Sequence, residues 1–479
     1  KSHLRFSKSP IRSTYLIKAA DFLACHSQSY ITRYDMIHEI KDGGTFLLNT
    51  SWTEEELTEK LPGDVKQYIA RHNVQFYIVD ANRLARELGL GNHANMILQA
   101  AFFKLSGVMP VEDAVRHMKE AVQKTYAKKG EKVVNMNMAA VDAGINSPVK
   151  VNVPADWANA ADDRTVDESL PDVVKNIVVP CNRQRGDDLP VSAFLPYQDG
   201  TYPLGTSKYD KRGIAAFLPQ WDSNKCLQCN QCTFVCPHAA IRPVLLDSAE
   251  EAAKPTGFET VPARGMNGKY TYRIQVSPYD CTGCGSCAAS CLSKDKALTM
   301  QPVDDTMYDE TNWNYALSLK DKPGVFDRKT LKGSQFSQPL VEFSGACAGC
   351  GETPYAKLIT QLYGEKTYWV NGVGCSLAWA GAFPSLPYTK NKEGRGPAFY
   401  GTLFEDQAEN GLGVVLATKQ RRAYVKQVAQ QLLPLVPGTE LETAIHAWLS
   451  SFDDLDANDA DARKLTAALE SASLTGAAA

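Results

Sequence analysis

Eight of the thirteen cysteines in this chain lie between Cys226 and Cys291, where they form two copies of one spacing, C-x2-C-x2-C-x3-C. In iron–sulfur proteins with two clusters, the first three thiolates of such a run bind one cubane, and the fourth binds the other. The spacing therefore predicts two 4Fe–4S clusters with crossed ligand sets. The two predicted sets are Cys226, Cys229, Cys232 with Cys291, and Cys281, Cys284, Cys287 with Cys236.

A structural zinc site is the alternative reading of these cysteines. Zinc ribbons pair cysteines across a longer loop around one tetrahedral ion, whereas each run here supplies four thiolates from one short segment. Pro237 follows the first run, and Leu292 stands at the matching place after the second. The stretch between the runs is long, which predicts an inserted hairpin or loop around residues 255–272.

The composition is that of a globular protein, with 44% hydrophobic and 22% charged residues among 479. A formal net charge of −3 gives no electrostatic case for binding nucleic acid or an anionic membrane. Clustered cysteines in a long chain indicate metal binding in a reducing compartment, so we expect a cytoplasmic protein. The chain begins with Lys1 rather than Met, so we expect either a piece of a longer chain or a processed chain.

Residues 1–165 have the pattern of a Rossmann-like α/β domain. Two apolar runs of strand length, 44–49 and 74–80, flank Thr53 and Glu56, which have the spacing of a capping box at a helix start. This order predicts a βαβ unit with a parallel pair of strands. A helix is expected over 111–128, because one face at helical spacing is apolar. That face consists of Ala114, Val115, Met118, Val122 and Tyr126.

The rest of the chain divides by composition into a multidomain α/β and α+β protein. A proline-rich extended connector is expected over 166–221, a two-cluster ferredoxin-like domain over 222–304 and a linker over 305–340. Residues 341–479 resume an α/β pattern, with a helical tail from about residue 417.

A third group of cysteines opens this last part: Cys347 and Cys350 in a C-x2-C pair, followed by Cys375. Three thiolates leave a 4Fe–4S cluster one ligand short. The fourth ligand could come from sequence beyond this chain, from Cys25 or Cys181, or from a non-protein ligand. A zinc site or two buried cysteines are the alternatives.

Five segments together resemble the pyruvate:ferredoxin (flavodoxin) oxidoreductase family, in the family's order: residues 2–6, 10–15, 206–209, 340–355 and 372–376. The resemblance implies a fragment that holds the coenzyme A-associated domain, the two-cluster ferredoxin domain and the start of the thiamine diphosphate-binding domain. It also implies oxidative decarboxylation of pyruvate to acetyl-CoA and CO2, with single electrons passing through three 4Fe–4S clusters to ferredoxin or flavodoxin. A homodimer is expected on the same ground. The alternatives are an enzyme for another 2-oxoacid, or a polyferredoxin-like electron-transfer subunit without catalysis.

The resemblance also assigns roles to residues of the third group. Cys347, Cys350 and Cys375 match three ligands of the cluster nearest thiamine diphosphate, and the fourth family ligand is absent from this sequence. Glu352 matches the carboxylate that contacts the aminopyrimidine, and Cys375 also lies against the cofactor. A helix N-terminal acid is the alternative for Glu352. The family's Gly-Asp-Gly motif for Mg2+ should follow the present C-terminus.

The resemblance identifies the residues that contact coenzyme A less specifically. Arg5 and Arg33 would face phosphates, although a solvated surface charge explains Arg33 equally well, and no phosphate-binding glycine loop is present. The implied contact residues are Ser2, His3, Leu4, Arg5, Phe6, Arg33, Asn137 and Asn176.

Overall fold

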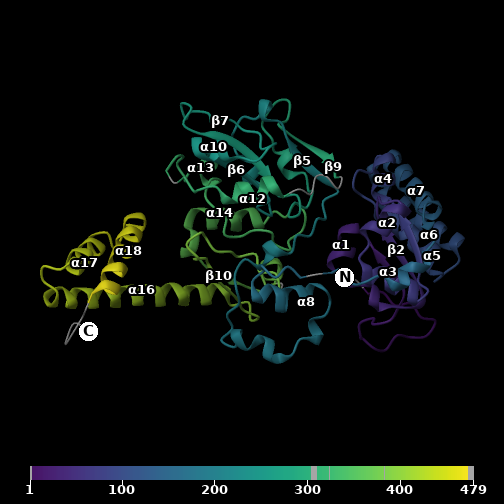
Figure 1. Ribbon diagram of the computed structural model, residues 1–479, viewed down its shortest axis with the longest axis horizontal. Helices are drawn as coiled ribbons and strands as arrows, with labels where there is room; N and C mark the ends of the chain where they lie inside the picture. Colours follow the sequence, from purple (N-terminus) through teal and green to yellow (C-terminus); the bar gives the residue numbers. More distant parts are fainter. Residues whose placement is uncertain (1–2, 165, 304–309, 323, 382, 473–479) are drawn as a thin grey trace. The chain divides into compact units, whose positions relative to one another are not determined.

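The computed structural model describes residues 3–164, 166–303, 310–322, 324–381 and 383–472, in a mixed α/β architecture (Figure 1). The chain divides into two units, one of Lys1–Tyr368 with Cys375–Ala398 and one of Trp369–Gly374 with Phe399–Ala479. Within the described ranges, no helix combines the length and the apolar character needed to cross a membrane.

The N-terminal domain is built on a four-stranded sheet in the order β1-β2-β3-β4. Its strands are β1 (Ala20–Cys25), β2 (Ile40–Asn49), β3 (Gln75–Val79) and β4 (Val149–Lys150). β2 pairs in parallel with both β1 and β3, and β4 is antiparallel to β3. Both predicted strands and their parallel pairing are therefore confirmed. The predicted capping box is also present, because Thr53 and Glu56 exchange hydrogen bonds at the start of α2 (Glu54–Lys60).

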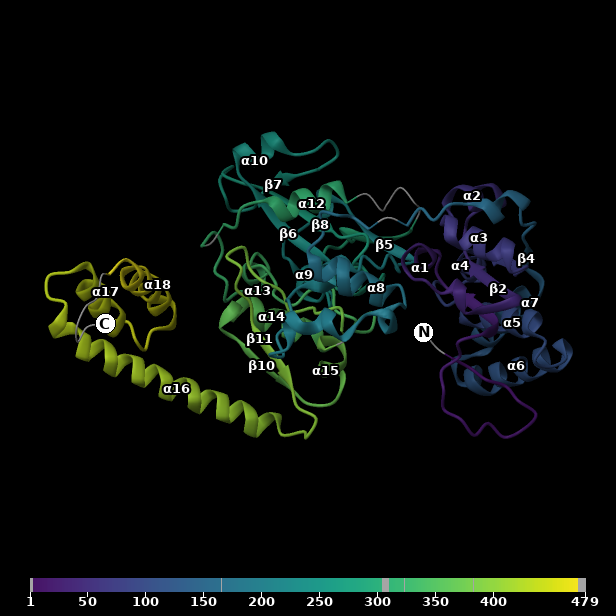
Figure 2. The ribbon, with the colours of Figure 1, turned by 60° about the horizontal axis from the view of Figure 1, so that its bottom comes forward.

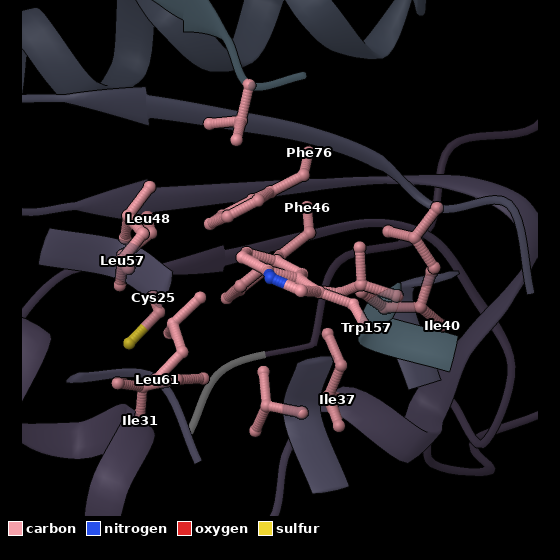
Figure 3. Close-up of a cluster of buried hydrophobic side chains, with 14 of the residues drawn as sticks. Cys25, Ile31, Ile37, Ile40, Phe46, Leu48, Leu57, Leu61, Phe76 and Trp157 are labelled. Atoms are coloured by element: carbon pink, nitrogen blue, oxygen red, sulfur yellow. The ribbon is translucent and has the colours of Figure 1, made fainter. Parts of the chain in front are cut away.

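Alternating side chains of β2 pack into two hydrophobic cores on opposite faces of this sheet. Phe46 and Leu48 join the first core, where Phe46 stacks on Phe76 with ring centroids 5.3 Å apart (Figure 3). α2 and α3 (Gly63–Arg71) close that core, and Trp157 packs into it.

Leu47 faces the second core, which is covered by four helices. These are α4 (Ala81–Glu87), α5 (Asn95–Ser106), α6 (Val111–Tyr126) and α7 (Glu131–Asn146). The helix predicted over 111–128 is confirmed as α6. Its predicted apolar face is turned inward, with Ala114, Met118 and Val122 buried.

The segment expected to be an extended connector instead contains a series of short helical turns. These are η4 (Val174–Val178), α8 (Val179–Asn182), η5 (Gly186–Asp188), η6 (Val191–Tyr197) and η7 (Thr206–Tyr209). Pro180 and Pro190 fit these turns because a proline at or near a helix start loses no backbone hydrogen bond, whereas Pro196 lies inside η6. The segment ends in β5 (Phe217–Trp221), which pairs with β9 (Leu298–Pro302), so the sheet structure around the cysteines begins before residue 222.

The cysteine-rich part carries a three-stranded antiparallel sheet, β6-β8-β7, besides the β5–β9 pair. β6 is Ile241–Leu246, β7 is Val261–Pro262 and β8 is Thr271–Val276, with α10 (Ser248–Ala253) between β6 and β7. β7 and β8 form the hairpin predicted around 255–272. Two one-turn helices, α9 (Gln231–Phe234) and α11 (Ser286–Ala289), occupy equivalent places in the two cysteine runs.

The remaining elements follow the second run. The expected linker contains α12 (Thr311–Ser318) and α13 (Leu331–Ser334), with residues 304–309 and 323 outside the described ranges. After it come α14 (Thr353–Tyr363), β10 (Tyr368–Asn371), α15 (Cys375–Ala380) and β11 (Ala398–Gly401), and β10 pairs with β11.

The predicted helical tail is confirmed in the second unit. It comprises α16 (Gln407–Leu432), α17 (Glu440–Ser450) and α18 (Leu455–Ser471). α17 and α18 pack together at the C-terminal end of α16, around Ile445 and Trp448 (Figure 2).

Candidate functional site

Four cysteines from both runs line one cavity, here named site 1. They are Cys236 from the first run and Cys281, Cys284 and Cys287 from the second. Cys281 and Cys287 are held just after β8 and on α11, and Cys236 lies between α9 and β6. The structure therefore brings together one of the two crossed sets expected from the spacing.

The other crossed set lines a second cavity, named site 2. Its cysteines are Cys226, Cys229, Cys232 and Cys291. Trp221 and Tyr272 also line it, so its walls are largely aromatic and aliphatic. All eight cysteines are free thiols, and no three His, Cys, Asp or Glu side chains in the described ranges are placed to bind a single ion.

The loops that present these thiols depend on left-handed residues. The residue before the second cysteine has positive φ in both runs, +57° for Gln228 and +68° for Gly283. A side chain in this region costs free energy, and the Gln228 amide is fixed by hydrogen bonds of 2.9 Å to the Pro262 carbonyl and 2.8 Å from the Arg264 N–H. This turn lets the Gln228 and Gly283 N–H groups donate to the first sulfur of each run, at 3.4 Å.

The protein alone disfavours charged thiolates at both sites. Burial raises the pKa of Cys287 to about 12, with Cys236 and Cys284 contributing in the same direction. Burial likewise raises the pKa of Cys281 and Cys232, and neighbouring cysteines add to the effect. Bound metal cations reverse this preference, because a coordinating thiol is deprotonated outright. Four thiols from the two runs around one cavity therefore fit an iron–sulfur cluster.

The Cys347–Cys350 loop repeats the left-handed turn of the two runs, but its N–H to sulfur hydrogen bond is made to the second cysteine rather than the first. Gly349 precedes the second cysteine with φ +74°, and the Glu352 N–H donates to the Cys350 sulfur at 3.4 Å. A Cβ on Gly349 would lie 3.7 Å from the Cys284 Cβ, so this loop packs against site 1. Cys375 is the first residue of α15, and its side chain is exposed.

The two other cysteines lie in different surroundings. Cys25 is buried in the N-terminal core, and Cys181 is half-buried on α8. Neither is among the residues that line sites 1 and 2.

Glu352 stands at the N-cap position of α14, but its side chain does not cap the helix. It is exposed, and one carboxylate oxygen accepts a hydrogen bond of 3.1 Å from the buried Trp379 indole. Trp379 lies on α15, which begins at Cys375, so one hydrogen bond joins the two helices that carry the predicted thiamine diphosphate residues.

The predicted coenzyme A residues are spread over several elements. His3 accepts from the Ile17 N–H at 3.0 Å, and Arg5 stacks over Tyr15 and donates to the Ser13 carbonyl. Leu4 and Phe6 are exposed, and Ser2 lies outside the described residues.

Arg33 is not a freely solvated charge. It donates to the Asp210 carbonyl at 3.1 Å and lies over the Tyr279 ring. Asn137 is buried in α7 and donates to the Val133 carbonyl, whereas Asn176 is exposed on η4.

Two residues beside the cysteines were missed by the sequence analysis. His238 lines site 1, and burial followed by the nearby Arg212 charge lowers its pKa to about 4, so its imidazole is neutral. Lys357 is buried on α14 and donates to carbonyls of α9. In the sequence, Lys357 could have been noticed only from its position on the same helical face as Thr353, Ala356 and Thr360, all of which are buried.

Comparison with known proteins adds independent evidence. Residues 1–147 match the family described as pyruvate ferredoxin/flavodoxin oxidoreductase, 160–215 match a domain of unknown function, and 225–295 match the 4Fe–4S dicluster domain. The middle match covers most of the segment expected to be a connector.

Curated relatives match nearly the whole chain. Pyruvate-flavodoxin oxidoreductase of Enterobacter agglomerans is 49% identical over 451 residues, which are 94% of this chain and 38% of the relative. Pyruvate:ferredoxin oxidoreductase of Moorella thermoacetica is 48% identical over 459 residues, 95% of this chain and 39% of the relative. Among solved structures, the PORC subunit of a pyruvate oxidoreductase from Thermotoga maritima matches 28% of this chain and 67% of its own, with 15% identity and a TM-score of 0.23.

This chain thus spans under two fifths of the length of the first two relatives. The matched stretches nevertheless cover 94% and 95% of this chain. By these identities and the two named domain matches, this chain is similar over almost its whole length to the pyruvate:ferredoxin/flavodoxin oxidoreductases, and its residues 1–147 match the model of that family.

Proposed function

We propose that sites 1 and 2 each hold a 4Fe–4S cluster, and that this chain carries single electrons between them. The observation that supports this most strongly is the sorting of eight thiols into two cavities, four to each, with ligands crossed between the runs. All-cysteine ligation without a histidine ligand favours low reduction potentials, unlike those of Rieske centres.

A third 4Fe–4S cluster is proposed at Cys347, Cys350 and Cys375, with a fourth ligand from outside this chain. The left-handed turn at Gly349 repeats that of the two runs, and an N–H to sulfur hydrogen bond is also present, at Cys350. Contact between this loop and Cys284 would place the third cluster next to site 1.

The proposed activity of the whole protein is oxidative decarboxylation of pyruvate to acetyl-CoA and CO2, with ferredoxin or flavodoxin as acceptor. This rests on the names of the relatives, and this chain would supply the electron-transfer part. Thiamine diphosphate, when bound, would supply the carbanion stabilisation that decarboxylation requires. Glu352 and Cys375 would contact it, and residues outside this chain would bind its Mg2+.

Several finer assignments belong to the same proposal. The N-terminal domain would be Rossmann-like and would contact coenzyme A through Arg5 and Arg33, and residues from 341 onward would begin the thiamine diphosphate domain. The protein would act as a cytoplasmic homodimer, since clusters with thiolate ligands suit a reducing compartment.

Anaerobic purification followed by iron, acid-labile sulfide and zinc analysis tests the cluster assignment. We expect about eight irons per chain in two stable clusters, with the third absent or easily lost. Stoichiometric zinc with no visible absorbance would show that the cysteines hold zinc instead. Three robust clusters in this chain alone would show that the fourth ligand of the third site lies within it.

A further inference from the structure

A lysine is buried where α14 packs on the first cysteine run. The side chain of Lys357 is 3% exposed, and its Nζ donates to the carbonyl oxygens of Thr233 and, at 3.2 Å, of Phe234. These carbonyls lie between Cys232, which lines site 2, and Cys236, which lines site 1. The ammonium group therefore contacts the short backbone segment that joins the two sites.

No carboxylate pairs with Lys357 within the described part of the chain, where both of its hydrogen bonds go to backbone carbonyls. A buried ammonium without a counter-charge is costly. Burial lowers the pKa of Lys357 to about 8, and among its charged neighbours the Cys236 and Cys232 thiols oppose that effect while Arg242 adds to it. The cysteines of the two sites are thus the neighbours that supply negative charge to Lys357.

We propose that Lys357 is a positioning residue whose ammonium serves as the buried counter-charge of the clusters and raises the reduction potential at site 1. The inference rests on the proposed function, because it requires clusters at the two sites. A cubane with four thiolates is anionic and becomes more so on reduction, so a fixed cation favours the reduced form. Site 1 is also the site that the third cysteine loop contacts at Gly349. A raised potential there favours electron movement from that loop into the two-cluster module.

A purely structural role must be distinguished from this one. The last carbonyls of a helix lack intrahelical partners, and a lysine side chain can satisfy them. Glutamine at position 357 would keep N–H donors but remove the charge, whereas arginine would keep the charge. The two variants therefore separate charge from hydrogen bonding.

The test compares the chain with Lys357→Gln, Lys357→Arg and, as a control with the same charge change at an exposed position of α7, Lys132→Gln. Each protein is prepared anaerobically, analysed for iron and sulfide, and titrated with EPR detection. We expect Lys357→Gln to keep its iron while the cluster at site 1, identified as the signal that Cys236→Ala removes, accepts electrons at least tenfold less readily, a shift of 59 mV for a one-electron couple. Lys357→Arg and Lys132→Gln should keep both potentials.

Unchanged potentials in a fully loaded Lys357→Gln protein would overturn the inference. Loss of the clusters from that variant, with normal secondary structure by circular dichroism, would also overturn it, because Lys357 would then serve cluster assembly. Absence of clusters from the unsubstituted chain would be a separate result, since it would refute the proposed function itself and the inference with it.

Discussion

Replacing Cys236 with alanine separates crossed from uncrossed ligation, because Cys236 belongs to the first run but lines site 1. The other three thiols of that site come from the second run. We therefore expect Cys236→Ala to damage the cluster at site 1 and to spare the cluster at site 2, whose four cysteines are untouched.

The size of the effect follows from the lining of the two cavities. Each site has four thiols, and one cubane at each gives about eight irons per chain. With one of four ligands removed, site 1 should lose its cluster, so that iron falls toward about four per chain. One EPR signal of the reduced protein should remain at its original potential.

Redox titration with EPR detection, with iron and sulfide analysis of the same samples, measures both quantities. Cys181→Ala is a suitable control, because that thiol is half-buried on α8 and lines neither cavity. Cys291→Ala should produce the reciprocal loss at site 2. If Cys236→Ala and Cys232→Ala removed the same signal and left the other intact, each run would hold its own cluster and the crossed arrangement would be refuted.

Three further predictions concern the stability of the fold. Glu342→Ala should lower the free energy of unfolding, measured by urea titration, by about 3–5 kcal/mol, because it leaves the mostly buried Arg242 without its ion-pair partner. The control is Asp21→Ala in the exposed pair with Lys41, which should lower the free energy of unfolding by under about 1 kcal/mol. Phe76→Ala should cost about 3–5 kcal/mol, because it empties the stack against Phe46 in a closed core; an unchanged urea midpoint would mean that this core is not formed. Burial raises the pKa of Cys25 from 9.0 to about 12, so the folded state favours the neutral thiol, and the stability this contributes below pH 9 should be lost as the pH rises from about 9 toward 12. Urea midpoints at pH 7.5 and 10 should therefore differ less in Cys25→Ala than in the unsubstituted chain, and equal differences would contradict this account.

The sequence predicted the elements that depend only on residues a few positions apart. The capping box at Thr53 and the apolar face of α6 were readable because each depends on neighbours three or four positions away. The crossed cysteine sets could be predicted because, in a run of this spacing, the fourth cysteine binds the other cluster. The short helices between 174 and 209 were not, since each is too brief to show a hydrophobic period.

Contacts between distant segments could not be predicted in the same way. Lys357 meets carbonyls more than a hundred positions earlier in the chain, and nothing in the pattern of α14 identifies that partner. The residue shows only as a lysine on an otherwise buried face. Trp379 likewise gave no sign of bonding to Glu352, because an indole on an apolar helix is usually explained by packing alone.

The segment of the third cysteine group is fixed to the first run by several independent contacts, which explains why its loop meets site 1 rather than site 2. The Phe343 N–H donates to the His238 carbonyl at 3.0 Å, and Glu342 pairs with Arg242 on β6. Lys357 holds the opposite end of the segment on α9. Because His238 and β6 directly follow Cys236, these contacts place the Cys347–Cys350 loop on the side of the first run that faces site 1. A cluster at the third group would then reach site 2 by way of site 1, so the order of the three clusters is a consequence of which backbone segments pack together.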